Sequence, residues 1–207
     1  FNDIQAAELT HCRMILYTVS AIEARRTAAA YAGRAMSVPF DGSLTMGTMH
    51  MKELIGITPD PGITQTILES CKTVGADVYT YFGPLPKVFS TGGNDFFDQV
   101  YGTIWLTFAL QVSVFNAIAT TPTKIPQTEA GIAILRNAVT AVLQQAVVNG
   151  FSAPGAWNSP QLFGNPEELR ENVLLYGWYV YSAPVNQQSQ SQREERIAPL
   201  IQGACKL

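Results

Sequence analysis

The histidines are the first place to look for acid–base chemistry, and the chain of 207 residues has two, His11 and His50. His11 precedes Cys12, but adjacent residues on a strand point to opposite faces, which argues against a thiolate–imidazole pair. His50 lies in a methionine-rich run of alternating polarity, where a lone histidine more often packs than reacts. Neither histidine therefore predicts a catalytic site.

Nucleophile and phosphate-binding motifs give no stronger signal. Ser152 lies near glycines in residues 149–155, but the spacing is not Gly-x-Ser-x-Gly and a helix is expected before it. The glycines at 92–93 and 150–155 do not match the Walker or dinucleotide patterns. The sequence predicts no nucleotide site, and we expect no cofactor.

Metal chemistry is equally poorly supported. Cys12, Cys71 and Cys205 are odd in number and widely scattered, which fits neither a disulfide framework nor a zinc site and favours a reducing compartment. The methionines at 46, 49 and 51 lack the cysteine or histidine company of a soft-metal site, so they are interpreted as core-filling residues.

Two charged clusters remain. Glu167, Glu168 and Glu171 surround Arg170 and are interpreted as a solvated helix face, with a carboxylate pair as the alternative. The run of Arg193, Glu194, Glu195 and Arg196 is either a solvated segment or a set of charges that fixes register with a neighbouring copy. It is the candidate subunit-contact segment.

The elements that would position these residues alternate in type and predict an α/β fold, a mixed sheet flanked by helices. With 47% hydrophobic and 14% charged residues, we expect one domain over 1–207. The prolines at 84 and 86 are expected to break the strand before them, and glycines 92–93 to form a mobile turn.

The predicted helices are 2–9, 22–35, 63–74 closed by Gly75, 95–119, and 128–148 capped by Thr128. The predicted strands are 13–18, 44–51, 77–82, 176–182 and 200–207. Residues 149–166 are expected to form a long loop.

The longest uncharged stretch, 99–123, has the length of a membrane span. Its polar residues Thr103, Thr107 and Gln111 recur every four residues and fall on one helical face, while large apolar residues cover the rest. We interpret it as a buried core helix with one wetter seam. A net charge of −3 predicts no attraction to nucleic acid or to an anionic membrane surface.

Six blocks together resemble a family of tailed-bacteriophage proteins similar to contractile tail sheath subunits, in order and spacing over most of residues 43–207. The blocks are TMHMKELIGITP (48–59), ADVYTYFG (76–83), TPTKIPQTEAG (121–131), APGAWN (153–158), GWYVY (177–181) and QSQSQREERIAP (188–199). Residues 1–42 carry little of the resemblance.

The resemblance implies a structural virion protein and not an enzyme. It implies hexameric rings that stack around a tail tube protein and contract to drive the tube through the host envelope for genome ejection, in a virion tail made in the bacterial cytoplasm. It also implies terminal arms that add strands to a neighbour's sheet. Phe1, the lack of a signal peptide and a strand expected to reach Leu207 predict a protease-resistant fragment without those arms, monomeric alone. The alternatives are a small α/β enzyme or ligand-binding domain using His50 or the Glu167–Glu171 cluster, and another tail or baseplate component.

Overall fold

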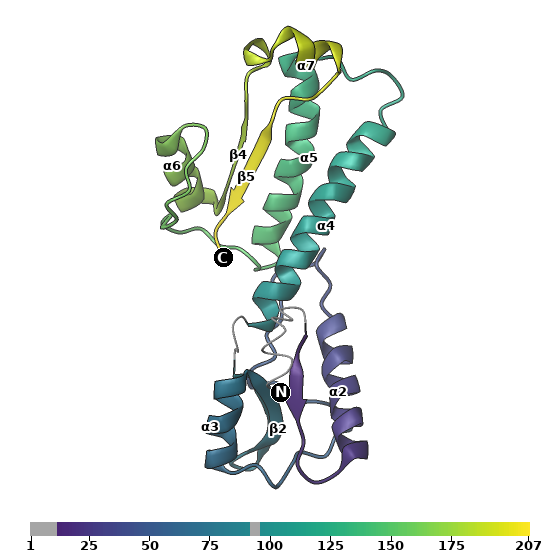
Figure 1. Ribbon diagram of the computed structural model, residues 1–207, viewed down its shortest axis with the longest axis vertical. Helices are drawn as coiled ribbons and strands as arrows, with labels where there is room; N and C mark the ends of the chain where they lie inside the picture. The colour runs from purple at the N-terminus through teal and green to yellow at the C-terminus, as the bar shows by residue number, and fades with distance from the viewer. Residues whose placement is uncertain (1–11, 92–95) are drawn as a thin grey trace. The chain divides into compact units, whose positions relative to one another are not determined.

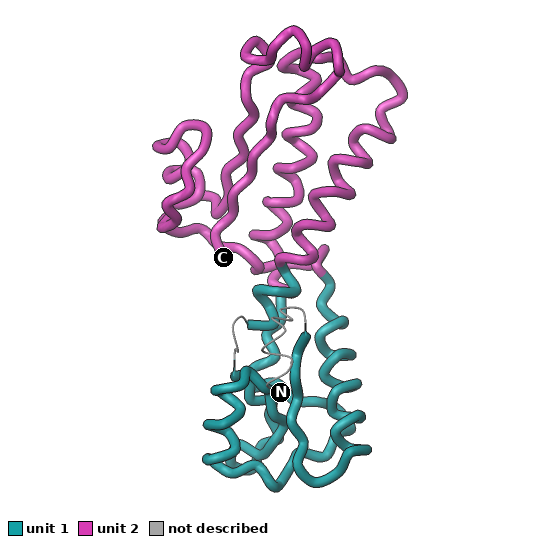
Figure 2. Tube along the Cα trace, viewed as in Figure 1, with its two compact units in different colours: residues 1–39, 46–102 teal, residues 40–45, 103–207 magenta. Residues whose placement is uncertain are grey.

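A computed structural model describes residues 12–91 and 96–207 of the chain. The chain folds into two compact units (Figure 2): unit 1 is Phe1–Pro39 with Met46–Gly102, and unit 2 is Phe40–Thr45 with Thr103–Leu207. The expectation of one domain over 1–207 stays a prediction. The predicted helix at 2–9 and turn at 92–93 lie outside the described residues.

Unit 1 is built on a three-stranded mixed sheet in the order β1-β2-β3 (Figure 1). β1 (Met14–Leu16) pairs in parallel with β2 (Ala76–Phe82), and β2 pairs in antiparallel with β3 (Leu85–Phe89). The connection from β1 to β2 contains α2 (Ala21–Met36) and α3 (Gln65–Val74).

Alternation along β2 explains how one short sheet carries two cores. Ala76 and Val78 pack with Cys71 of α3, whereas Tyr79 packs in a second cluster with Tyr31 of α2. Successive strand residues point to opposite faces, so each helix covers one side of the sheet. Helix α3 ends as predicted, because Gly75 adopts the left-handed conformation with φ of 67°.

The prediction of a strand at residues 44–51 is wrong. Residues 44–51 form no strand: Leu44 and Met51 have φ of 53° and 58°, which no regular strand allows, and Lys52 and Met51 instead exchange backbone hydrogen bonds with Val88. The strand before the prolines ends as predicted, because β2 stops at Phe82, ahead of Pro84, but the sheet continues into a further strand. Gly83, with φ of 61°, makes the turn of a hairpin, and Pro86 sits on β3 at the sheet edge, where a proline is tolerated.

Unit 2 places a two-stranded antiparallel sheet, β4 (Trp178–Ser182) and β5 (Ile201–Cys205), between two helices (Figure 1). Helix α5 (Glu129–Val148) contacts both strands, and α6 (Pro166–Tyr176) contacts β4. Gly203 of β5 lies under α5, where a Cβ would meet a methyl of Leu143 at 3.2 Å.

The helix ends follow the sequence signals. Thr128 caps α5 by accepting the N–H of Gly131, as predicted, and Asn165 caps α6 with Pro166 at its first position. Helix α4 (Phe97–Ala119) supplies the remaining long helix, and a turn, η1 (Val185–Gln187), precedes the short α7 (Gln190–Glu194). The predicted α/β class and both long helices are confirmed.

Residues 40–45 belong to unit 2 because α5 holds them. The side-chain amide of Gln145 donates to the carbonyls of Phe40 and Gly42 at 2.9 and 3.1 Å, and Asn149 donates to Phe40 at 3.0 Å. The Phe40 ring also stacks on Trp105 at a centroid distance of 4.8 Å. Three amide hydrogen bonds and a stacked ring fix a segment that has no secondary structure of its own.

Candidate functional site

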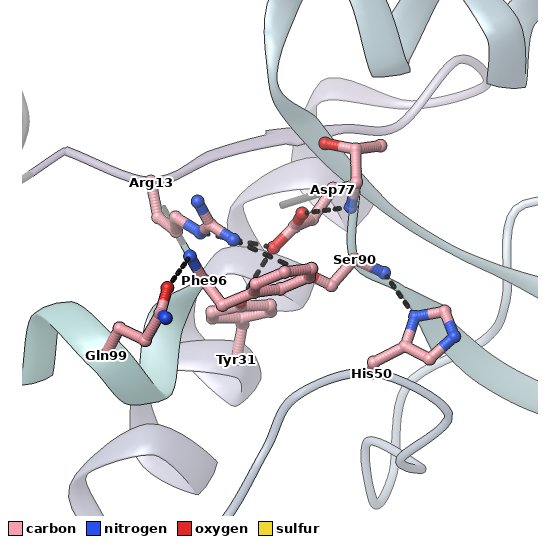
Figure 3. A network of polar contacts seen from close by, with 8 residues as sticks. Arg13, Tyr31, His50, Asp77, Ser90, Phe96 and Gln99 are labelled. Atoms are coloured by element: carbon pink, nitrogen blue, oxygen red, sulfur yellow. Dashed lines mark hydrogen bonds and ion pairs between the residues drawn. The ribbon is translucent and has the colours of Figure 1, made fainter. Parts of the chain in front are cut away.

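Asp77 on β2 is the centre of a buried polar network in unit 1 (Figure 3). Its carboxylate accepts hydrogen bonds from the Tyr31 hydroxyl at 2.7 Å and from the backbone N–H of Thr91 at 3.0 Å. The guanidinium Nε of Arg13 lies 3.5 Å from the oxygen that Tyr31 also contacts. These donors come from α2, from the segment after β3 and from the residue before β1.

The network binds elements together and does not present a reactive group. Burial of the Tyr31 ring, and next the negative charge of Asp77, raise the pKa of this tyrosine above its ordinary value, so it remains a donor. Two hydrogen bonds and the ion pair with Arg13 stabilise the buried Asp77 carboxylate. The network therefore ties α2 and the segments beside the sheet to β2.

His50 lies beside this network, in the long segment between α2 and α3. Its Nδ1 accepts the backbone N–H of Ser90 at 3.2 Å, and its ring meets Phe89 edge-on at 5.1 Å. An open hollow of about 280 Å³ adjoins it, slightly below the ~300–1,000 Å³ of typical ligand sites. The hollow is lined by Thr48, Met49, His50, Ser90, Phe96, Phe97 and Asp98. The imidazole accepts a backbone N–H and meets an aromatic ring, but His50 is exposed, so it is a residue at the rim of the hollow and not a core residue.

The thiols and carboxylates of the described residues do not assemble into a metal site. Across residues 12–91 and 96–207, no three histidine, cysteine, aspartate or glutamate side chains group closely enough to hold an ion. Cys12 is exposed, Cys71 is buried and Cys205 is half-buried, each as a free thiol. Glu167, Glu168 and Glu171 lie exposed on α6, as a solvated helix face should.

The candidate contact segment, residues 193–196, folds into the end of α7 and the turn after it. Ser189 and Gln192 form a reciprocal capping box at the start of α7. The Arg193 guanidinium donates to the Val185 carbonyl at 2.7 Å, so this residue is engaged within its own chain. Glu194, Glu195 and Arg196 are exposed, and Arg196 has φ of 58°. All four charged residues thus lie at the surface, and Arg193 is also held by its hydrogen bond to Val185.

Helix α4 corrects the sequence interpretation most strongly. The prediction of a buried core helix is wrong, because Gly102 is its one buried residue. The side chains of Ile104, Phe108, Phe115 and Ile118 are 47, 65, 68 and 55% exposed. On the opposite face, the Ser113 hydroxyl donates to the Ala138 carbonyl of α5 at 3.0 Å. By length and composition α4 and α5 would each suffice to cross a membrane, a weak criterion that core helices also meet.

A second exposed apolar group ends helix α6. Leu174, Leu175 and Tyr176 are 55, 57 and 55% exposed, whereas Leu169 and Val173 of the same helix are fully buried against β4 and its neighbours. Sequence reasoning found neither surface, because the apolar residues of 99–123 were assigned to a core and no apolar helix face was predicted over 166–176. Hydrophobicity alone does not distinguish a surface covered by the same chain from one covered by a partner.

The comparison with protein families decides the relationship. A family model for the C-terminal domain of E217 tail sheath protein gp31-like proteins matches residues 97–207, more than half of the chain. The chain belongs to this tail sheath family. No curated protein matches the chain.

The tail sheath match has a definite footprint on the fold. It begins at Phe97, the first residue of α4, and includes α5, α6, the β4–β5 sheet and the candidate contact segment. The resembling blocks at 48–59 and 76–83 fall outside the matched residues. Membership in a sheath family makes this a structural component of a bacteriophage tail that assembles with other sheath subunits. The two exposed apolar surfaces both lie within the matched sheath domain.

Proposed function

We propose that the chain is part of a contractile tail sheath subunit, which polymerises as stacked hexameric rings around the tail tube and contracts to drive the tube through the host envelope. The observation that carries this proposal is the sheath-domain match over residues 97–207. The described residues support it indirectly: in unit 1 the buried Asp77 is hydrogen-bonded by Tyr31, and in unit 2 large apolar side chains of α4 and α6 are exposed. The subunit would be made in the host cytoplasm and act in the virion.

The β4–β5 sheet offers a physical route to such an assembly. Its two strands pair with each other in the described structure, which leaves each with an outer edge of backbone groups. A strand supplied by a neighbouring subunit would add to such an edge through main-chain hydrogen bonds. One correction bears on this route: β5 ends at Cys205, so Leu207 does not lie inside a strand as expected.

Electron microscopy of the full-length protein that carries this chain tests the proposal. Tubes or rings, with six-fold symmetry in end-on views and co-assembly with the tube protein, would support it. A full-length protein that stays monomeric under all assembly conditions would contradict it. The 207-residue chain alone is expected to be monomeric at micromolar concentration in sizing with light scattering.

The candidate contact segment has its own test. Glu194→Lys with Arg196→Glu reverses two exposed charges on the turn after α7. If these charges set register with the next subunit, the double variant should assemble more slowly and with altered salt dependence, since rim charges act mainly on encounter. Arg25→Glu with Glu69→Lys reverses two exposed charges of unit 1, also without a change in net charge, and is the matched control. Equal assembly rates for both variants would remove the segment from the interface.

A further inference from the structure

Unit 2 carries two apolar surfaces on opposite flanks. In Figure 1 α6 lies on one side of the β4–β5 sheet, and α5 and then α4 lie on the other. The contacts agree with this order, because α6 contacts β4, α5 contacts both strands, and α4 is hydrogen-bonded to α5. The α4 stripe (Ile104, Phe108, Val112, Phe115 and Ile118) faces away from α5. The α6 patch (Leu174, Leu175 and Tyr176) lies beside Val173, whose side chain points inward.

We propose that the α4 stripe of one subunit packs on the α6 patch of the next copy of this chain. The proposal rests on the proposed sheath function for its occupant and deepens it by naming the two surfaces that meet. Two different patches on opposite flanks make a head-to-tail contact, which generates rings or helical filaments, whereas a self-complementary patch stops at a dimer.

Charge supports a second copy as the occupant. No charged side chain occurs between Gln99 and Thr123, and the three residues of the α6 patch are uncharged, so these residues can meet without burying an ion. Arg170 and Glu171 lie exposed one helical turn from the patch, at its rim. Thr107, Gln111 and Asn116 share the exposed side of α4 with the stripe. A protein surface can hydrogen-bond such groups, whereas the hydrocarbon of a bilayer cannot.

The area fits a contact that works inside a polymer. The stripe exposes about 500 Å² of apolar side chain, taking ~150–250 Å² for a whole aromatic side chain and the exposed fractions of these residues. A standard interface buries ~800 Å² per partner, so the stripe supplies the apolar core of one and not its whole extent. Association of the isolated chain should therefore be weak and appear only well above micromolar concentration.

Sedimentation equilibrium of the 207-residue chain, up to about 1 mM, measures this association directly. The average mass should rise continuously with concentration, without a plateau at the dimer. Phe108→Glu with Phe115→Glu, and separately Leu174→Glu with Leu175→Glu, should each weaken association at least about tenfold. An equimolar mixture of the two double variants retains one intact surface of each kind, so its mass should rise to that of a dimer and stop.

A matched control distinguishes the effect of disrupting these two surfaces from the effect of adding negative charge to the chain. Val19→Glu with Ile22→Glu changes two side chains of unit 1 that are 64 and 62% exposed, and it should leave association unchanged. All three double variants have a net charge of −5, from −3 and two added carboxylates. Circular dichroism checks folding, and the single variant Phe115→Glu replaces the first pair if that pair unfolds.

Several results would overturn the proposal. The wild-type chain could remain monomeric at the highest concentration, or the α6 variant could still dimerise through α4. The control could dissociate like the two test variants, or the chain could bind phosphatidylcholine vesicles in an α4-dependent way. Failure here is distinct from failure of the sheath function, which is scored on polymers of the full-length protein. If the full-length protein polymerises and the substitutions on both surfaces leave the polymers unchanged, only the proposed contact is refuted. If the two double variants form a dimer when mixed but the full-length protein does not polymerise, only the sheath function is refuted.

Discussion

Removing the Tyr31 hydroxyl should destabilise unit 1 by an amount that the network fixes. Tyr31→Phe keeps a ring that is 4% exposed and packed edge-on against Phe97, and deletes the 2.7 Å hydrogen bond to Asp77. Hydrogen bonds to charged groups contribute ~1.5–3 kcal/mol. Asp77 keeps the hydrogen bond from Thr91 and the ion pair with Arg13. We expect a loss of about 2 kcal/mol in the free energy of unfolding at pH 7.

The same substitution should matter less at alkaline pH. The pKa of Tyr31 is raised in the folded protein above the ordinary value of 10.0, by burial and then by Asp77. Above pH 10 the unfolded chain therefore loses a proton that the folded chain keeps, and stability falls as pH rises. Phenylalanine cannot ionise, so the difference between wild type and Tyr31→Phe should narrow between about pH 9 and the higher pKa of the folded state.

Urea unfolding followed by circular dichroism at about pH 7 and pH 10.5 measures both effects. Tyr81→Phe is the control, because this tyrosine is on the same β2 strand and 52% exposed. It should change stability by less than ~0.5 kcal/mol. A Tyr31→Phe variant as stable as wild type at the lower pH, or a gap that widens at the higher pH, would refute the description of this network.

Backbone and thiol predictions follow from single positions. Gly177→Ala should lower the free energy of unfolding by ~3 kcal/mol or more, since the φ of Gly177 is 82° and a Cβ would lie 2.9 Å from backbone atoms. Gly83→Ala should lower it by only ~1–2 kcal/mol, because Gly83 has φ of 61° but open space around its Cα. Urea unfolding that ranks Gly83→Ala as the more destabilising variant would contradict this. In the native chain Cys12 should react with a disulfide reagent far faster than the buried Cys71 and the half-buried Cys205, because burial raises the pKa of the latter two thiols. Thiol titration with and without urea checks this, and fast native labelling of all three would count against it.

Local signals in the sequence predicted the elements that depend on local chemistry. The Thr128 cap, the Gly75 stop and the strand at 77–82 each depend on neighbouring residues, and each is present. The run 44–51 misled because its alternation of polar and apolar residues has no partner strand. Leu44 instead donates its N–H to Val148, a contact between residues far apart in the chain.

The exposure of α4 could not be predicted for a different reason. Hydrophobicity indicates that a surface avoids water, but not whether the cover comes from the same chain. Phe108 and Phe115 have the composition of core residues and are two-thirds exposed here. The network around Asp77 was also missed, because Arg13, Tyr31 and Thr91 have no common spacing in the sequence.

The division into two units also distributes the aromatic side chains unevenly. All three tryptophans, Trp105, Trp157 and Trp178, belong to unit 2. Excitation selective for indole therefore reports on unit 2 without any attached dye. Trp105 sits on α4, stacked on Phe40, so its emission provides an intrinsic optical sensor of events along that helix. Assembly of the unlabelled protein can be followed in real time by light alone.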